Sequence, residues 1–157
     1  FTTNFMTLLN RLPIMPLYYN GSTKFSPIHV SDIVEIIFQM IENQNESLIM
    51  ECIGPEVMSF KEILKELLNS IDKKRLLLPL PKPIASLTAK FLQLLPKPLL
   101  TEDQLKLLKY DNIKSGLYKT NFDLGLKTNR TFRTEVDKYS YNWKSGGQYA
   151  SKKNIVN

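Results

Sequence analysis

The stretch Phe25-Ser26-Pro27-Ile28-His29-Val30-Ser31-Asp32-Ile33-Val34-Glu35 passes from a β-prone run, which begins at Lys24, into a helix. Pro27 cannot donate a hydrogen bond to a neighbouring strand, so we place this strand at the edge of a sheet. Asp32 and Glu35 have the spacing of a capping box, which predicts that the helix begins at Asp32. The apolar residues that follow form a wide face, which indicates burial against a sheet: Ile33, Ile36, Ile37, Met40 and Ile41.

The segments on both sides alternate between helical and β-prone patterns. Residues 1–12 have the spacing of an amphipathic helix that ends at Pro13. Two β-prone runs flank Asn20-Gly21, which predicts a tight turn or a hairpin. The apolar run 47–53 is typical of a strand buried on both faces, with Cys52 as a packed structural thiol.

Helical patterns dominate the rest of the chain. Ser59 and Glu62 form a second capping box, and the helix after it has a regular apolar face: Phe60, Ile63, Leu64, Leu67, Leu68 and Ile71. A strand is expected at 76–80, a helix at 84–95, a third capping box at 101–104, and a last helix from Phe132 to Trp143. Gly146-Gly147 and the polar residues around them predict a flexible tail over 144–157. The element order predicts an α/β or α+β chain.

The composition excludes several classes of site. The chain has 157 residues, one His and one Cys, and a net charge of +6. A single cysteine excludes an internal disulfide, and one His with one Cys cannot build the usual zinc site. The lysines are scattered rather than clustered among aromatic residues, so we expect a solvated surface and no nucleic-acid partner.

An ordered series of motifs extends over nearly the whole chain. After the run 25–34 come Leu48 to Gly54-Pro55-Glu56-Val57, Ser59-Phe60-Lys61-Glu62-Ile63, Leu78-Pro79-Leu80-Pro81, Leu94-Leu95-Pro96-x-Pro98-x-x-Thr101-x-Asp103-Gln104, Asp111-Asn112, Leu124-Gly125-Leu126 and Tyr141-x-Trp143-x-x-Gly146-Gly147-Gln148-Tyr149. The series resembles the C-terminal part of atypical extended short-chain dehydrogenases/reductases, of the NAD-dependent epimerase/dehydratase superfamily. Within these it is similar to the subgroup of the NADPH-binding accessory subunit of respiratory complex I.

The resemblance implies the C-terminal portion of a Rossmann-type NAD(P)-binding protein, the last sheet elements plus a small, mostly helical substrate or lid domain. Residues 1–143 would be the C-terminal part of the domain. Within it, 32–56 would complete the Rossmann sheet, and 1–31 with 57–143 would form the small domain. The chain opens at Phe1, inside an apolar-periodic helix, so we expect a fragment whose N-terminal Rossmann half is missing.

No cofactor-binding or catalytic residue is assigned to this chain. A dinucleotide site needs a glycine-rich turn between a strand and a helix, and the sequence has none, so NADP or NAD is expected only in the intact protein. The family's catalytic pair is a Tyr with a Lys four residues later. Two such spacings occur, Tyr110–Lys114 and Tyr149–Lys153, but neither follows a central strand, and about one match is expected by chance.

Three residues are candidates for the substrate cleft: Lys24, Phe25 and His29. Lys24 lies where relatives have an arginine that can meet a phosphate. His29 is the only histidine, either lining the cleft or hydrogen-bonded locally within a strand.

The resemblance favours an accessory or assembly factor related to respiratory complex I or quinone metabolism, in the cytoplasm or the mitochondrial matrix. The apolar stretch 81–98 carries three lysines and is a candidate for docking on respiratory-complex subunits or on the inner-membrane surface. The alternative is an enzyme, an NAD(P)-dependent oxidoreductase or epimerase acting on a small or nucleotide-linked substrate. A basic helical interaction module unrelated to dehydrogenases is a third, weaker hypothesis.

Overall fold

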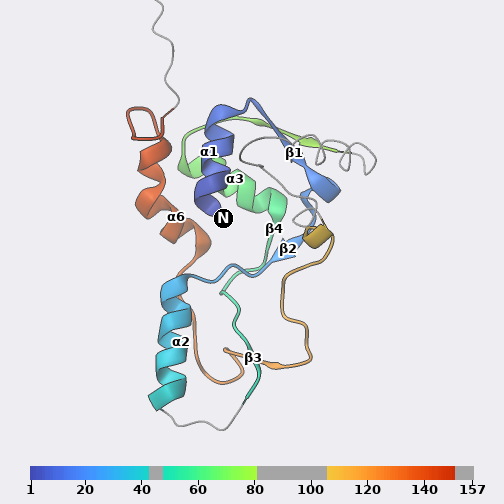
Figure 1. The fold of residues 1–157 in the computed structure, drawn as a ribbon, viewed down its shortest axis with the longest axis vertical. Helices are drawn as coiled ribbons and strands as arrows, with labels where there is room; N and C mark the ends of the chain where they lie inside the picture. The colour runs from blue at the N-terminus through green and yellow to red at the C-terminus, as the bar shows by residue number, and fades with distance from the viewer. Residues whose placement is uncertain (43–47, 81–105, 151–157) are drawn as a thin grey trace, which may run out of the picture.

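Helix α3 (Phe60–Ser70) lies at the centre of the core in the computed structural model, which describes residues 1–42, 48–80 and 106–150 (Figure 1). Helices α1 (Thr2–Arg11) and α6 (Phe132–Ser140) pack against α3, and the short helix η2 (Tyr141–Trp143) continues α6. The predicted apolar face of α3 is confirmed, because all of its members are buried: Phe60, Ile63, Leu64, Leu67, Leu68 and Ile71.

Both hydrogen bonds of the predicted capping box at α3 are present. The Glu62 N–H donates to Ser59 Oγ at 3.2 Å, and the Ser59 N–H donates to Glu62 Oε2 at 2.7 Å. These bonds satisfy two backbone amides that the first turn of a helix leaves without a partner.

The strands form three small two-stranded sheets. β1 (Ile14–Leu17) lies parallel to β5 (Leu76–Pro79), and β3 (Met50–Glu51) lies parallel to β6 (Lys119–Thr120). β2 (Lys24–Phe25) is antiparallel to β4 (Met58–Ser59). The chain is therefore of mixed helix and strand structure with small parallel sheets.

The region around Asn20-Gly21 is a turn but not a hairpin. β1 and β2 have different partners, and the short helix η1 (Tyr18–Gly21) lies between them. Tyr19, Asn20 and Gly21 all have positive φ, at 50°, 59° and 68°. The hairpin alternative is wrong because β1 pairs with β5 and β2 pairs with β4, so the two strands do not pair with each other.

Helix α2 (Val30–Glu42) begins before Asp32, so the capping box predicted at Asp32 and Glu35 is wrong. His29 caps the helix instead: its Nδ1 accepts from the Ser31 N–H at 3.2 Å, and its carbonyl accepts from the Asp32 N–H at 3.0 Å. The strand ends at Phe25, so His29 is not the strand residue expected from the sequence.

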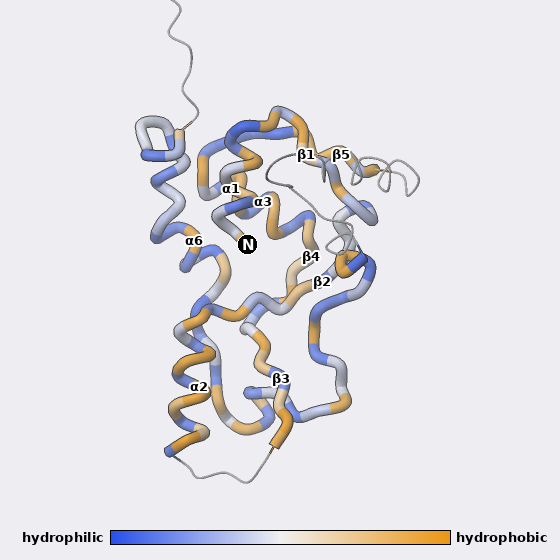
Figure 2. The backbone as a smooth tube through the Cα atoms, viewed as in Figure 1, coloured by the Kyte–Doolittle hydropathy of each residue, from blue (hydrophilic) through white to orange (hydrophobic). Residues whose placement is uncertain are grey.

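The predicted apolar face of α2 is only partly buried: Ile37 and Ile41 are exposed. Ile36 is buried, whereas a stripe along the helix is 52–70% exposed: Val30, Val34, Ile37, Phe38 and Ile41. We call these five residues the α2 stripe, and Figure 2 shows the apolar character of the helix. The expected burial against a sheet does not occur within the described residues.

The predicted strand at 47–53 is also less buried than expected. Only Met50 and Glu51 pair, with β6, while Ile49 is 68% exposed and Cys52 is exposed. The expectations of a strand buried on both faces and of a packed thiol are therefore wrong. Their common cause is that nothing in the described residues covers this side of β3.

Residues 144–150, the first part of the segment expected as a flexible tail, fold back onto α1. The Tyr149 N–H donates to the Asn142 carbonyl at 2.7 Å, and Asn10 Nδ2 donates to the Tyr149 carbonyl at 2.5 Å. The rings of Trp143 and Tyr149 lie 4.9 Å apart. Residues 151–157, the helix expected at 84–95, the capping box at 101–104 and the docking stretch 81–98 lie outside the described residues.

Acid is expected to weaken the fold through carboxylates that accept hydrogen bonds. Bonds from Ser59 lower the pKa of Glu62 from its ordinary value of 4.5, and bonds from Thr120 lower that of Asp123 from 3.8. A carboxylate with a lowered folded-state pKa contributes stability above its ordinary pKa, and that contribution is lost as the pH falls through the folded value.

The Ser59→Ala variant tests this at one helix. At neutral pH it should lose about 1 kcal/mol of the free energy of unfolding in urea, because the cap and its bond to the ionised Glu62 are both removed. The deficit in the free energy of unfolding should shrink at a pH low enough to protonate Glu62. The control is Ser31→Ala: Ser31 is exposed, so this variant should lose little stability at either pH. A deficit that grows in acid would contradict the assignment.

Candidate functional site

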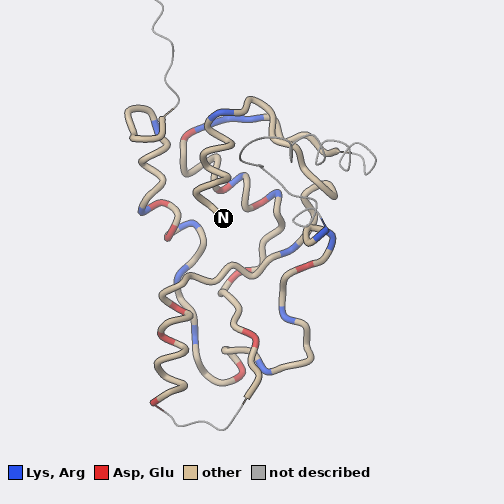
Figure 3. The backbone as a smooth tube through the Cα atoms, viewed as in Figure 1, with Lys and Arg blue, Asp and Glu red and all other residues tan. Residues whose placement is uncertain are grey.

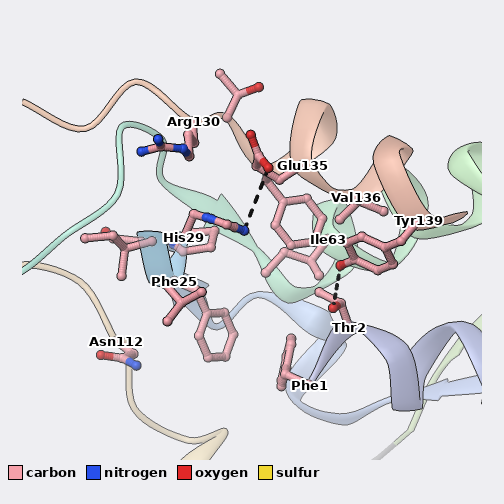
Figure 4. Close-up of a pocket in the computed structure, with 16 residues that line it drawn as sticks. Phe1, Thr2, Phe25, His29, Ile63, Asn112, Arg130, Glu135, Val136 and Tyr139 are labelled. Atoms are coloured by element: carbon pink, nitrogen blue, oxygen red, sulfur yellow. Dashed lines mark hydrogen bonds and ion pairs between the residues drawn. The ribbon is translucent and has the colours of Figure 1, made fainter. Parts of the chain in front are cut away.

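A pocket of about 490 Å³ opens where the segment from β2 to α2 meets the start of α1 and one face of α6 (Figure 4). Its walls are mainly apolar, from Phe25, Ile63, Phe132 and Val136, with Phe1 beside them. The ring of Phe25 lies 6.4 Å from that of Phe60 and 6.3 Å from that of Phe1, which connects the pocket wall to the core.

Backbone contacts fix the segment 25–28 that lines the pocket. The Ser26 N–H donates to the Asn112 carbonyl at 3.0 Å, and the Asn112 N–H donates to the Lys24 carbonyl at 2.7 Å. A Cβ added to Gly54 would lie 1.7 Å from the Pro27 carbonyl oxygen. Only glycine allows this approach, so Gly54 helps to hold Pro27 in place.

His29 and Glu135 face each other across the pocket. Nε2 of His29 lies 3.7 Å from Oε2 of Glu135, too far for a direct hydrogen bond. Because Nδ1 accepts from the Ser31 N–H, the ring proton of neutral His29 is on Nε2 and points towards Glu135. Lys138 Nζ donates to the Glu135 oxygens at 2.6 and 2.7 Å, and these bonds hold the pKa of Glu135 below its usual range.

Arg130 lies at the same pocket and is already paired. It donates to Asp32 Oδ1 and contacts Glu35 Oε2 at 3.4 Å, and these carboxylates raise its pKa. Asp32 is only 3% exposed. These ion pairs explain why Asp32 and Glu35 do not cap α2. Both carboxylates instead contact Arg130, which lies in the segment that leads into α6.

A hydroxyl pair connects two lining elements. The Tyr139 phenol lies 2.8 Å from Thr2 Oγ1, within hydrogen-bond distance, and joins α6 to α1. Tyr139 and Glu135 are four residues apart on α6 and therefore lie on one helix face, together with Val136.

Two of the three residues expected in the cleft line this pocket. Phe25 and His29 do so, whereas Lys24 does not: its side chain is exposed, and its backbone N–H donates to Asp111 Oδ1 at 2.8 Å. Sequence reasoning missed Arg130, Glu135 and Tyr139. The i, i+4 spacing of Glu135 and Tyr139 was visible, but nothing local indicated that their face meets His29.

Neither Tyr–Lys spacing is at the pocket. Tyr110 is 66% exposed and does not line it. Tyr149 packs on Trp143, and its potential partner Lys153 lies outside the described residues.

Within residues 1–42, 48–80 and 106–150, no three His, Cys, Asp or Glu side chains gather in a way that could hold a metal ion. In the same ranges, no helix has the length and apolar character needed to cross a membrane.

Comparison of the sequence with models of protein families gives no match, and comparison with curated proteins gives none.

Proposed function

We propose that this chain is the C-terminal part of a short-chain dehydrogenase-like protein, in which a Rossmann half N-terminal to it holds NADP or NAD and packs against the α2 stripe. The observation that carries the proposal is the exposed stripe itself. Its members recur at positions 30, 34, 37, 38 and 41, the spacing of a helix face made to be covered.

The energy of covering this face is considerable. Fully burying a Val, Ile or Phe side chain contributes about 1.5–3 kcal/mol, and these residues retain more than half of their surface exposed. The two residues before β3 add apolar surface: Leu48 and Ile49 are 43% and 68% exposed. A sheet that extends from β3 and packs on α2 would bury both the α2 stripe and the apolar residues before β3. In a Rossmann fold, helices that cover the sheet alternate along the chain with its strands, which is the order of α2 and β3 here.

In this proposal the chain closes one side of the cofactor protein and supplies a pocket beside it. By the sequence resemblance, the whole protein acts as an accessory or assembly factor of respiratory complex I or of quinone metabolism, in the cytoplasm or the mitochondrial matrix. Tyr110 and Tyr149, which begin the two Tyr–Lys spacings of this chain, do not line the pocket, and this favours the accessory role.

One observation favours the enzymatic alternative, an NAD(P)-dependent oxidoreductase or epimerase. The pocket contains an imidazole and a phenol, His29 and Tyr139, both of which can exchange protons with a substrate. The alternative needs a Tyr-x-x-x-Lys pair in the N-terminal half.

The test uses the polypeptide encoded by the complete reading frame. Titrated with NADPH and followed by nicotinamide fluorescence, it should bind the cofactor, whereas the 157-residue chain should not, because it lacks a glycine-rich turn. A reading frame that adds no Gly-x-x-Gly-x-x-Gly turn, or a complete product that binds neither NADPH nor NADH, would refute the proposal. A Tyr-x-x-x-Lys pair after a central strand would favour the enzyme, and its absence the accessory role.

A further inference from the structure

The charges around the pocket disfavour an anionic ligand. Of the described residues that line it, Arg130 is the one with a permanent positive charge, and Asp32 and Glu35 already neutralise it. Glu135 presents a carboxylate to the pocket, and Glu56 accepts from the Phe132 N–H nearby at 2.9 Å. Helix α2, whose first residue Val30 lines the pocket, has no Lys or Arg (Figure 3). A phosphate or carboxylate would find no unpaired cationic side chain among the described residues that line the pocket, and it would face the Glu135 carboxylate.

The gap between His29 and Glu135 fits a hydroxyl group. An oxygen placed at an ordinary hydrogen-bond distance from both Nε2 and Oε2 can bridge the 3.7 Å that separates them. A hydroxyl can accept from the Nε2–H and donate to the carboxylate at the same time. A carbonyl or an ether can only accept, and an amine cannot accept once it is protonated.

The remaining walls fit an apolar ring. Phe25 and Ile63 lie beside the His29–Glu135 pair, with Phe1 near Phe25 (Figure 4), and Phe132 also lines the pocket. Aromatic walls favour a ring that can stack or meet them edge to face.

We propose that this pocket binds a small uncharged molecule with a ring-containing apolar body and one hydroxyl group, which lies between His29 Nε2 and Glu135 Oε2. The identification of this pocket as a substrate cleft rests on the proposed function. The binding itself uses residues of this chain alone. It makes a nucleotide-linked substrate unfavourable at this site, because the described lining has no unpaired cationic side chain to bind the diphosphate of such a molecule.

Three probes of nearly the same shape separate these features: para-propylphenol, para-propylanisole and para-propylphenyl phosphate. Each is titrated into the 157-residue chain, and the methyl chemical shifts of Ile63 and Val136 are followed by NMR. The phenol should bind about tenfold more tightly than the anisole, which cannot donate to Glu135. The phosphate should show no saturable shift.

Variants then assign the contacts. His29→Asn keeps an acceptor that can cap α2 but removes the Nε2–H, so the phenol should lose about tenfold in affinity. Glu135→Gln keeps the shape and removes the charge, so the phosphate probe should gain affinity. Lys24→Ala is the matched control at a residue outside the pocket and should bind all three probes like the unsubstituted chain.

Equal affinity for the phenol and the anisole, tighter binding of the phosphate, or no binding of any probe to a chain with a dispersed methyl spectrum would overturn the inference. None of these results bears on NADPH binding by the complete polypeptide. Conversely, phenol binding by a chain whose complete product binds no cofactor would leave the pocket assignment standing and remove the dehydrogenase-like proposal.

Discussion

Replacing Phe60 with alanine is expected to remove about 3–5 kcal/mol of the free energy of unfolding, because a large buried ring is deleted and leaves a cavity. Phe60 is 2% exposed and is the first residue of α3. Its ring lies 5.3 Å from that of Phe5 and 6.4 Å from that of Phe25, so it connects α1, α3 and β2. Urea unfolding followed by the fluorescence of Trp143 measures the loss.

The matched control is Lys65→Ala, on the exposed face of the same helix, which should change stability by no more than about 0.5 kcal/mol. Small domains have about 5–15 kcal/mol of stability in total, so Phe60→Ala should unfold at a much lower urea concentration. A loss below about 1 kcal/mol would show that the aromatic cluster is not part of the core of the isolated chain.

The isolated chain is expected to bind a hydrophobic dye strongly through the α2 stripe. In a triple variant, Val34→Gln, Ile37→Glu and Ile41→Lys, most of the dye fluorescence should disappear, because an exposed apolar face is replaced by polar side chains. The glutamate and the lysine would also be four residues apart, which stabilises a helix slightly. Unfolding in urea should therefore change little.

A second triple variant controls for apolar surface elsewhere. Leu107→Gln, Leu117→Gln and Tyr141→Gln change side chains that are 62–80% exposed and lie outside the stripe. The dye signal of this variant should stay close to that of the unsubstituted chain. An unsubstituted chain that binds no dye and unfolds cooperatively would argue that the stripe has no missing partner.

The elements that the sequence predicts well are those with a local cause. The faces of α3 and α6 follow from apolar spacing, and the α3 start follows from a capping box formed by Ser59 and Glu62, three residues apart. The same reasoning was wrong at α2. There, Asp32 and Glu35 have capping-box spacing, but Arg130, far away in the sequence, recruits both carboxylates.

The sequence predicts only the part of the pocket that lies within one local motif. Phe25 and His29 belong to one continuous motif and were found as candidates. Glu135 and Tyr139 meet that motif only through the packing of α6 on α3, which no local pattern specifies. The predicted burial of α2 and β3 was wrong for another reason. Their apolar patterns indicate covered faces, but none of the described residues covers the exposed apolar side chains there.

Solvent access to the α2 stripe tests the central claim most directly. Val34, 60% exposed, is replaced by cysteine in a background carrying Cys52→Ser, and thiol labelling rates are compared between the isolated chain and the complete polypeptide. Rates in denaturant serve as the common reference. If a Rossmann half covers the stripe, labelling in the complete polypeptide should be slower by at least about a hundredfold, because the thiol reacts only when the structure opens. Equal labelling rates in the two proteins would contradict the account.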